Sequence, residues 1–215
     1  MKRLITGYSE PLLYLITDRR MVRRNSGDSE LNALTTFVER ALAAGVDLVQ
    51  IRERDLSARS LFTLTEDLVT AAKNYGARVL VNDRIDIAAC AGAGAHLTTR
   101  SLTANVVRGI FPDMLIGAST HSLQEAEADE QAGADFIVFG PVFETESKKA
   151  YGPPVGVAAL RQVASRLQIP VLALGGIKMN NYRQALDAGA AGIAAISLFT
   201  AAADLQAVVQ EITGR

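Results

Sequence analysis

Four times along this 215-residue chain, a helix-like segment ends in an alanine- and glycine-rich cluster that leads directly into a short apolar run. The four clusters lie at residues 44–47, 91–94, 132–135 and 188–192. A glycine in each cluster fits the left-handed residue that commonly ends a helix, and a continuous apolar run is typical of a strand buried on both faces. The pattern therefore predicts helices that alternate with parallel strands.

The apolar runs predict eight strands, at 12–16, 48–51, 78–81, 95–97, 114–117, 136–139, 170–174 and 193–196. Stretches with apolar residues at helical spacing separate them, for example 31–44, 60–75, 123–132 and 157–167. Eight units in 215 residues leave about 27 residues each, the size of one strand and one helix. We therefore expect one domain, residues 1–215, folded as a (β/α)8 TIM barrel.

A doubly wound sheet is the alternative fold. That fold normally uses five or six strands and places a glycine-rich turn after the first one. In this chain the first predicted strand is followed by Thr17-Asp-Arg-Arg20 instead. The barrel is therefore the favoured prediction.

Composition excludes several classes of protein. The chain is 49% hydrophobic and 21% charged, which predicts a compact soluble globule. A net charge of −1 and the lack of tryptophan argue against a nucleic acid partner. No apolar run is long enough to span a membrane and no signal-peptide core follows Lys2 and Arg3, so we expect a cytoplasmic protein. The single cysteine, Cys90, is expected to pack inside a helix.

Polar residues collect at the ends of the predicted strands, where a barrel of this type has its active site. After strand 48–51, period-two alternation places Gln50, Arg52 and Arg54 on one side, directed into the barrel mouth. An exposed charged loop is the alternative for these three residues. Further polar residues follow the third, fifth and sixth strands: Asn82, Asp83, Ser119, His121, Thr145 and Lys148.

The last two strands end in residues suited to an anion. Gly175 and Gly176 follow the seventh strand, and Ile196 and Ser197 end the eighth. In many barrels these two loops offer backbone N–H groups to a phosphate, and glycine allows its oxygens to approach closely. We therefore predict a phosphate site there, with a simple tight turn as the alternative.

Seven segments run in order through most of the chain: Leu15-Ile-Thr-Asp18, Gln50-Ile-Arg-Glu-Arg54, Val81-Asn-Asp-Arg-Ile-Asp86, Gly117-Ala-Ser-Thr-His-Ser-Leu123, Phe139-Gly-Pro-Val-Phe143, Thr145-x-Ser147-Lys148 and Ala173-Leu-Gly-Gly-Ile177. Together they resemble the motifs of the thiamine phosphate synthase superfamily. The resemblance implies a (β/α)8 barrel with a phosphorylated thiazole as ligand. It also implies two activities. The synthase joins a pyrimidine diphosphate to a thiazole phosphate with Mg²⁺, whereas the TenI-like tautomerase aromatises a thiazole carboxylate phosphate without a metal.

Departures from the synthase motifs favour the tautomerase branch. Asp83 matches one magnesium-binding aspartate of the synthase, but Ser101 stands where the second is expected, next to Arg100. Arg54 also replaces a lysine that is usual in the synthase. Losing one carboxylate and adding a cation should weaken Mg²⁺ binding. We therefore expect a thiazole tautomerase with no metal or cofactor. The alternatives are a synthase with Mg²⁺ at Asp83 and a non-catalytic protein that binds thiazole phosphate.

The tautomerase reaction needs one group that removes a proton from the ring carbon bearing the carboxylate and delivers a proton to the exocyclic carbon. His121 is the candidate, because an imidazole titrates near neutral pH; alternatively, it simply precedes a helix that Ser122 caps. The other histidine, His96, is expected to be structural.

The remaining roles follow from charge. Arg52 and Lys148 would hold the substrate carboxylate. Segment 144–152 is either a mobile flap or an ordinary loop. We also expect a homodimer.

Overall fold

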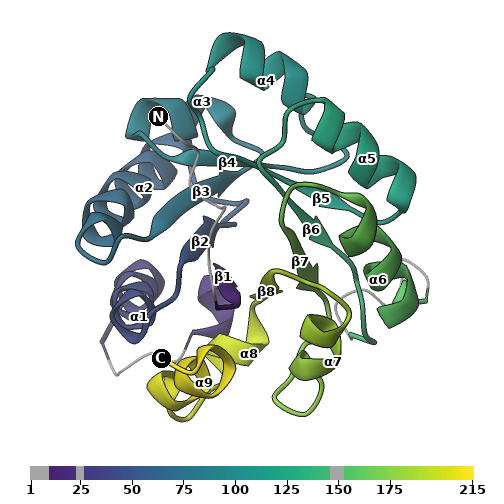
Figure 1. Ribbon diagram of the computed structural model, residues 1–215. Helices are drawn as coiled ribbons and strands as arrows, with labels where there is room; N and C mark the ends of the chain where they lie inside the picture. Colours follow the sequence, from purple (N-terminus) through teal and green to yellow (C-terminus); the bar gives the residue numbers. More distant parts are fainter. Residues whose placement is uncertain (1–9, 23–26, 146–152) are drawn as a thin grey trace.

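The computed structural model describes residues 10–22, 27–145 and 153–215. Eight parallel strands form one closed barrel in the order β1 to β8, and each pairs with its sequence neighbours, with β8 returning to β1 (Figure 1). The strands are β1 Leu12–Ile16, β2 Leu48–Ile51, β3 Arg78–Asn82, β4 Gly94–Leu97, β5 Ile116–Thr120, β6 Phe136–Phe139, β7 Val171–Leu174 and β8 Gly192–Ala195. The prediction of a (β/α)8 TIM barrel is confirmed.

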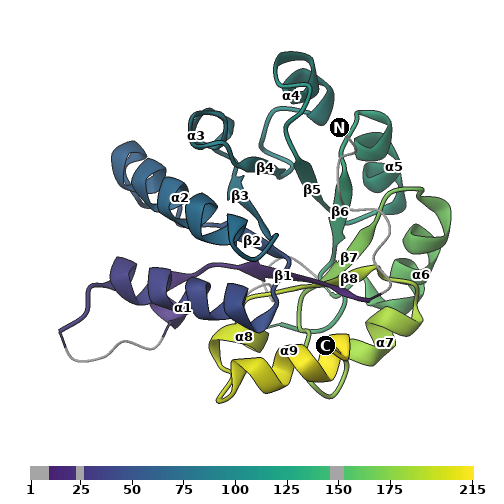
Figure 2. The ribbon, with the colours of Figure 1, turned by 60° about the vertical axis from the view of Figure 1, so that its left-hand side comes forward.

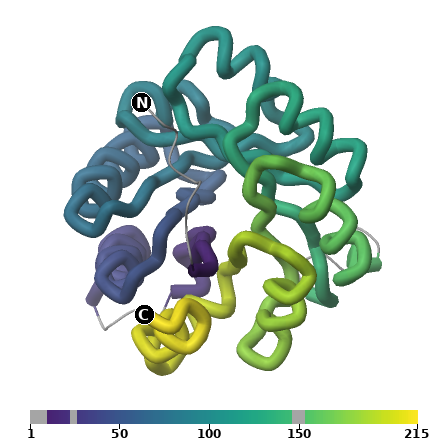
Figure 3. The backbone as a smooth tube through the Cα atoms, viewed as in Figure 1, coloured from purple at the N-terminus to yellow at the C-terminus, as the bar shows by residue number. Residues whose placement is uncertain are grey.

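Helices surround this barrel as an outer ring, which is clearest in the backbone trace (Figure 3). They are a short 3-10 helix, Arg19–Met21, and α1 Glu30–Ala44, α2 Ala58–Lys73, α3 Ile85–Ala91, α4 Ala104–Ile110, α5 Leu123–Gln131, α6 Gly156–Arg166, α7 Tyr182–Asp187, α8 Ser197–Thr200 and α9 Leu205–Thr213. In the turned view, α8 and α9 follow the last strand, and α9 lies beside α1 (Figure 2). None of the helices in the described ranges has the length and apolar character needed to cross a membrane.

The junctions between helix and strand have the expected geometry. Gly45 ends α1 with φ 105°, and Gly92 ends α3 with φ 68°, both left-handed conformations that L side chains rarely adopt. Strand β5 differs from the prediction of 114–117, because it begins two residues later, at Ile116. The backbone of Met114 is held outside the ladder, since its N–H donates to the Phe111 carbonyl and its own carbonyl accepts from Arg108.

Two apolar layers hold the molecule together. The larger layer fills the space between the barrel and the helices. The smaller one lies inside the barrel and is built from alternate strand residues: Leu12, Tyr14, Ile16, Leu48, Leu80, Phe136, Val138, Leu172 and Ala194. Alternation along each strand therefore also directs Gln50, Asn82 and His96 to the interior, near the carboxyl-terminal ends of their strands.

The prediction for Cys90 is wrong, because this residue is exposed. Helix α3 turns Ile87, Ala88 and Ala91 toward the core. Cys90 instead lies one turn after Asp86, which is also exposed. Apolar composition alone did not indicate which side of this short helix faces solvent.

Candidate active site

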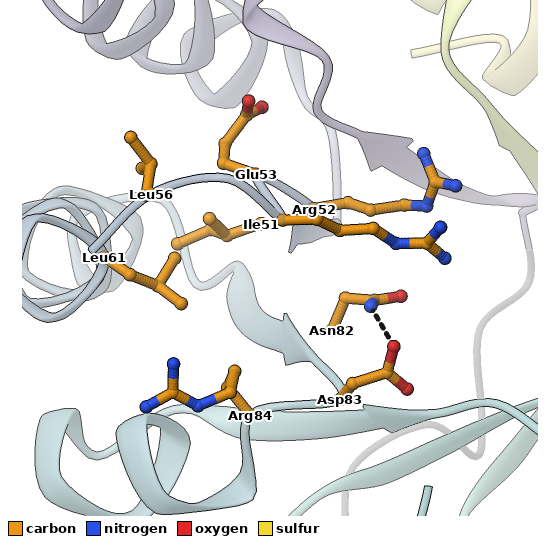
Figure 4. Close-up of a pocket in the computed structure, with 9 residues that line it drawn as sticks. Ile51, Arg52, Glu53, Leu56, Leu61, Asn82, Asp83 and Arg84 are labelled. Carbon is orange, nitrogen blue, oxygen red and sulfur yellow. Dashed lines mark hydrogen bonds between the residues drawn. The ribbon is translucent and has the colours of Figure 1, made fainter. Parts of the chain in front are cut away.

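The ends of β2 and β3 form a pocket with a basic wall (Figure 4). The side chains of Arg52, Asn82 and Asp83 extend toward the same side, while Arg84 points the opposite way. The residues that line the pocket are Ile51, Arg52, Glu53, Arg54, Leu56, Leu61, Asn82, Asp83 and Arg84. The predicted site residues Arg52, Arg54, Asn82 and Asp83 are therefore brought together.

Arg52 and Arg84 are half-buried cations that line this pocket, whereas Arg54 is exposed. Burial lowers the pKa of Arg52, and the neighbouring charge of Arg54 lowers it further. Two guanidinium groups that line one pocket repel one another, and an anion bound between them relieves this repulsion. The pair therefore favours a ligand with phosphate or carboxylate oxygens.

Glu53, which sequence reasoning missed, holds the end of β2 in place. Its buried carboxylate accepts from Thr17 Oγ1 at 2.7 Å, from the Arg19 N–H at 3.1 Å and from Arg19 Nη1 at 2.9 Å. The Thr17 hydroxyl in turn accepts from the Arg52 N–H at 3.0 Å. The sequence contains one indication of this role: alternation along the segment turns Glu53 away from the side that Arg52 faces.

Asp83 lies directly after β3 with φ 59°, in the left-handed region that few residues other than glycine adopt. Its Oδ2 accepts from Asn82 Nδ2 at 2.7 Å, and its Oδ1 accepts from Thr98 Oγ1 at 2.7 Å and from the Ser101 hydroxyl. Burial raises the pKa of Asp83, but the bonds from Ser101, Thr98 and Asn82, with the charge of Arg54, outweigh it and lower that pKa below its usual value. The carboxylate is therefore ionised and fixed in orientation.

The donor set around Asp83 fits a magnesium ion only in part. A carboxylate has about four lone-pair positions, and three of those on Asp83 already accept hydrogen bonds. Within the described residues, no group of three or more His, Cys, Asp or Glu side chains is placed to hold a metal. Mg²⁺ often binds one or two carboxylates and completes its shell with substrate phosphates and water. Asp83 therefore fits as the one carboxylate for an ion whose other ligands are phosphate oxygens and water.

The predicted residue Ser119 lies near the end of β5 and contacts the buried His96. His96 Nε2 is 2.8 Å from Ser119 Oγ, and His96 Nδ1 is 3.1 Å from the Tyr14 hydroxyl. Tyr14 also accepts from Gln50 Nε2 at 3.1 Å. Gln50 thus belongs to the barrel interior and is not among the residues that line the pocket next to Arg52.

His121 lies directly after β5, which β4 separates from β3 in the strand order, and it is exposed. Ser122 caps α5, as the alternative interpretation expected, because its hydroxyl accepts from the Glu125 N–H at 3.2 Å. The His121 ring contacts the Gly140 carbonyl through Nδ1. A carbonyl only accepts, so Nδ1 is the donor in this contact, which leaves Nε2 as the second nitrogen of the ring. Its catalytic role stays a prediction.

The predicted phosphate loops lie side by side, since β7 pairs with β8. Gly175 and Gly176 have positive φ, and a Cβ on them would lie 2.4 Å from Pro141 Cβ and 2.3 Å from the Glu144 carbonyl oxygen. Close packing against the loop after β6 is therefore one reason for both glycines. Ile196 precedes α8, and Ser197 begins it. The phosphate itself stays a prediction.

The rest of the predicted site is on the loop after β6. Thr145 is half-buried there. Lys148 and most of the proposed flap, residues 146–152, lie outside the described residues.

The buried His96 predicts a particular dependence of stability on pH. Burial lowers its pKa from 6.5 to about 3, so the folded protein keeps the ring neutral where the unfolded chain already binds a proton. The unfolded state then holds more protons between these two values, and the free energy of unfolding falls as the pH falls. From about pH 7 to about pH 5, this residue should remove about 2 kcal/mol. Urea titrations at several pH values give the free energy of unfolding of the wild type and of His96→Gln. The free energy of the wild type should fall more steeply as the pH falls, and an equal dependence on pH in the two proteins would contradict the prediction.

Comparison with known proteins gives a consistent result. Residues 13–199 match the family described as thiamine monophosphate synthase. A Geobacter sulfurreducens protein, provisionally named a thiamine-phosphate synthase, is 48% identical over 89% of this chain and 88% of its own length. The thiamine-phosphate synthase of Chlorobium phaeovibrioides is 40% identical over 88% of this chain and 86% of its own. Among solved structures, thiamine phosphate pyrophosphorylase from Pyrococcus furiosus is similar with a TM-score of 0.81 and 33% identity, over 94% of this chain and 93% of that one.

Proposed function

The chain belongs to the thiamine monophosphate synthase family of thiamine biosynthesis enzymes, and we propose that it is the transferase that joins a pyrimidine diphosphate to a thiazole phosphate. The observation that carries the proposal is the name shared by relatives that match nearly the whole chain at a third to a half identity. This reverses the order that the motif departures favoured, because relatives with the synthase name outweigh the exchanges at Ser101 and Arg54 and the added charge of Arg100. Nothing in these relatives points to the tautomerase branch.

The basic pocket suits the charge changes of this reaction. When the diphosphate is displaced from the pyrimidine, negative charge grows on its oxygens, and groups already oriented toward that charge lower the barrier. Arg52 and Arg54 both line this pocket and supply two positive charges there. A bound Mg²⁺ would neutralise further charge on the leaving diphosphate, with Asp83 as its protein ligand.

The thiazole phosphate would bind on the other side of the mouth. The backbone N–H groups of Gly175, Gly176 and Ser197, next to Ile196, are the proposed phosphate donors. Ser119 and Thr145 would then lie between the two substrates, on β5 and on the loop after β6. The two substrates would therefore meet at the centre of the barrel mouth.

A direct assay tests the proposal. Purified protein is incubated with the pyrimidine diphosphate and thiazole phosphate, and separately with the thiazole carboxylate phosphate tautomer, each with Mg²⁺ or with EDTA. The expected result is formation of thiamine phosphate that EDTA abolishes. Failure to couple the two substrates with Mg²⁺ present would overturn the proposal.

The tautomerase remains a second candidate because of two observations. Ser101 supplies a hydroxyl to Asp83 where the synthase motif has a second carboxylate, and the His121 ring contacts Gly140 through Nδ1, which leaves Nε2 as the nitrogen for proton exchange. This candidate predicts isomerisation that continues in EDTA and that His121→Ala abolishes. A non-catalytic protein would bind thiazole phosphate and turn over neither substrate set.

A further inference from the structure

A chain of four polar side chains crosses the apolar interior of the barrel. It runs from Gln50 on β2 to Tyr14 on β1, then to His96 on β4 and Ser119 on β5, with separations of 3.1, 3.1 and 2.8 Å. Gln50, Tyr14 and His96 are at most 2% exposed, whereas Ser119 is half-buried. Polar groups buried among apolar residues are costly unless each has a partner, so the arrangement must be satisfied along its whole length.

The donors in this chain can be ordered from one end to the other. The Gln50 amide donates to the Tyr14 oxygen, so the phenolic proton of Tyr14 is free to point to its other neighbour, His96 Nδ1. That nitrogen therefore accepts, and the ring carries its proton on Nε2. His96 Nε2 then donates to Ser119 Oγ, and the Ser119 proton must point to something else.

The aromatic rings hold this order in place. The Phe136 ring meets Tyr14 edge-on, with centroids 5.5 Å apart, and lies 6.4 Å from the His96 ring. The Tyr14 and His96 rings are 5.7 Å apart. Because Phe136 and Tyr14 are fully buried, the imidazole has little freedom to rotate.

We propose that Tyr14 and His96 are positioning residues that make the Ser119 hydroxyl a hydrogen-bond donor toward the substrate in the barrel mouth. Position 119 then selects a substrate that presents an acceptor there, a ring nitrogen or a phosphate oxygen, and disfavours one that presents an N–H. The inference rests on the proposed function for the identity of the substrate, but the order of the protons is a property of the protein alone.

The first experiment measures the proton on His96 without any substrate. Nitrogen-15 NMR of the imidazoles distinguishes the two neutral forms, and His121→Ala assigns the spectrum because the chain has two histidines. His96 is expected to carry its proton on Nε2 at neutral pH, and Tyr14→Phe is expected to weaken that preference. A proton on Nδ1, or a charged ring, would overturn the proposal even if the enzyme is an active synthase.

The second experiment measures the consequence in the coupling reaction. His96→Leu removes the donor to Ser119 and should lower kcat/KM about tenfold, the effect of one lost hydrogen bond. His96→Gln keeps a donor near the position of Nε2 and should restore most of that loss. In a Ser119→Ala background, His96→Leu should have no further effect.

The controls separate this role from a purely structural one. Each variant is compared by its thermal midpoint, so that loss of folding is not counted as loss of activity. If His96→Leu lowers kcat/KM by the same factor in the wild type and in the Ser119→Ala background, the proposal is overturned. Complete lack of coupling in the wild type would refute the proposed function, while the NMR result would still decide the proton order.

Discussion

Asp83→Asn is expected to lower kcat/KM for the coupling reaction by about a hundredfold or more, while the protein stays folded. The substitution removes the negative charge and keeps the shape of the side chain. Among the described residues that line the basic pocket, Asp83 is the carboxylate that faces the same side as Arg52. Without it, a magnesium ion that arrives with the diphosphate has no charged protein ligand there. Steady-state kinetics at several Mg²⁺ concentrations measure the loss.

Asparagine is the right replacement because of the backbone. Asp83 has φ 59°, and asparagine adopts that conformation more readily than alanine, which would add strain to the loss of charge. Asp67→Asn, an exposed change on α2, is the matched control and should leave kcat/KM unchanged. Coupling that survives Asp83→Asn would show that the carboxylate is not needed. A metal-independent tautomerase would also be little affected by this change, so the same variant separates the two candidate functions.

The sequence predicts most of the fold because the signals are local. Apolar runs, helical spacing and a glycine at each junction lie within single segments, and they locate seven strands to within about two residues. Strand β5 is displaced because Arg108 binds the Met114 carbonyl, a contact from the preceding helix that no run of apolar letters contains.

The site is less predictable because its contacts join distant segments. Alternation correctly directs Arg52 to the pocket, but it does not reveal that Glu53 binds Thr17 and Arg19. Motif comparison treats Ser101 as a missing carboxylate, whereas the folded chain uses its hydroxyl to orient Asp83. Such partners meet only when neighbouring strands pair, β1 with β2 and β3 with β4.

Gly117→Ala is expected to destabilise the barrel by about 3 kcal/mol, at the upper end of the effects of overpacking. Gly117 faces the interior on β5, where an added Cβ would lie 2.3 Å from Cζ of the Phe136 ring. Phe136 is fully buried and packs edge-on against Tyr14, so its ring has no free space to enter. Chemical denaturation gives the free energy directly, and the thermal midpoint should fall by about 6–12 °C for a chain of this size.

Two further variants decide whether this clash is the cause. Gly109→Ala adds the same methyl group on the exposed side of α4, where nothing lies within 4 Å, and should be neutral or stabilising by up to about 1 kcal/mol. Phe136→Leu leaves a space beside residue 117, so the double variant Gly117→Ala/Phe136→Leu should lose clearly less than the sum of the single changes. Strict additivity would instead mean that the two residues do not interact.

Phe136 also holds the Tyr14 and His96 rings in place. The Gly117→Ala protein should therefore also show a weaker preference for the proton on Nε2 of His96, because a displaced Phe136 ring loosens the hydrogen bonds that end at Ser119.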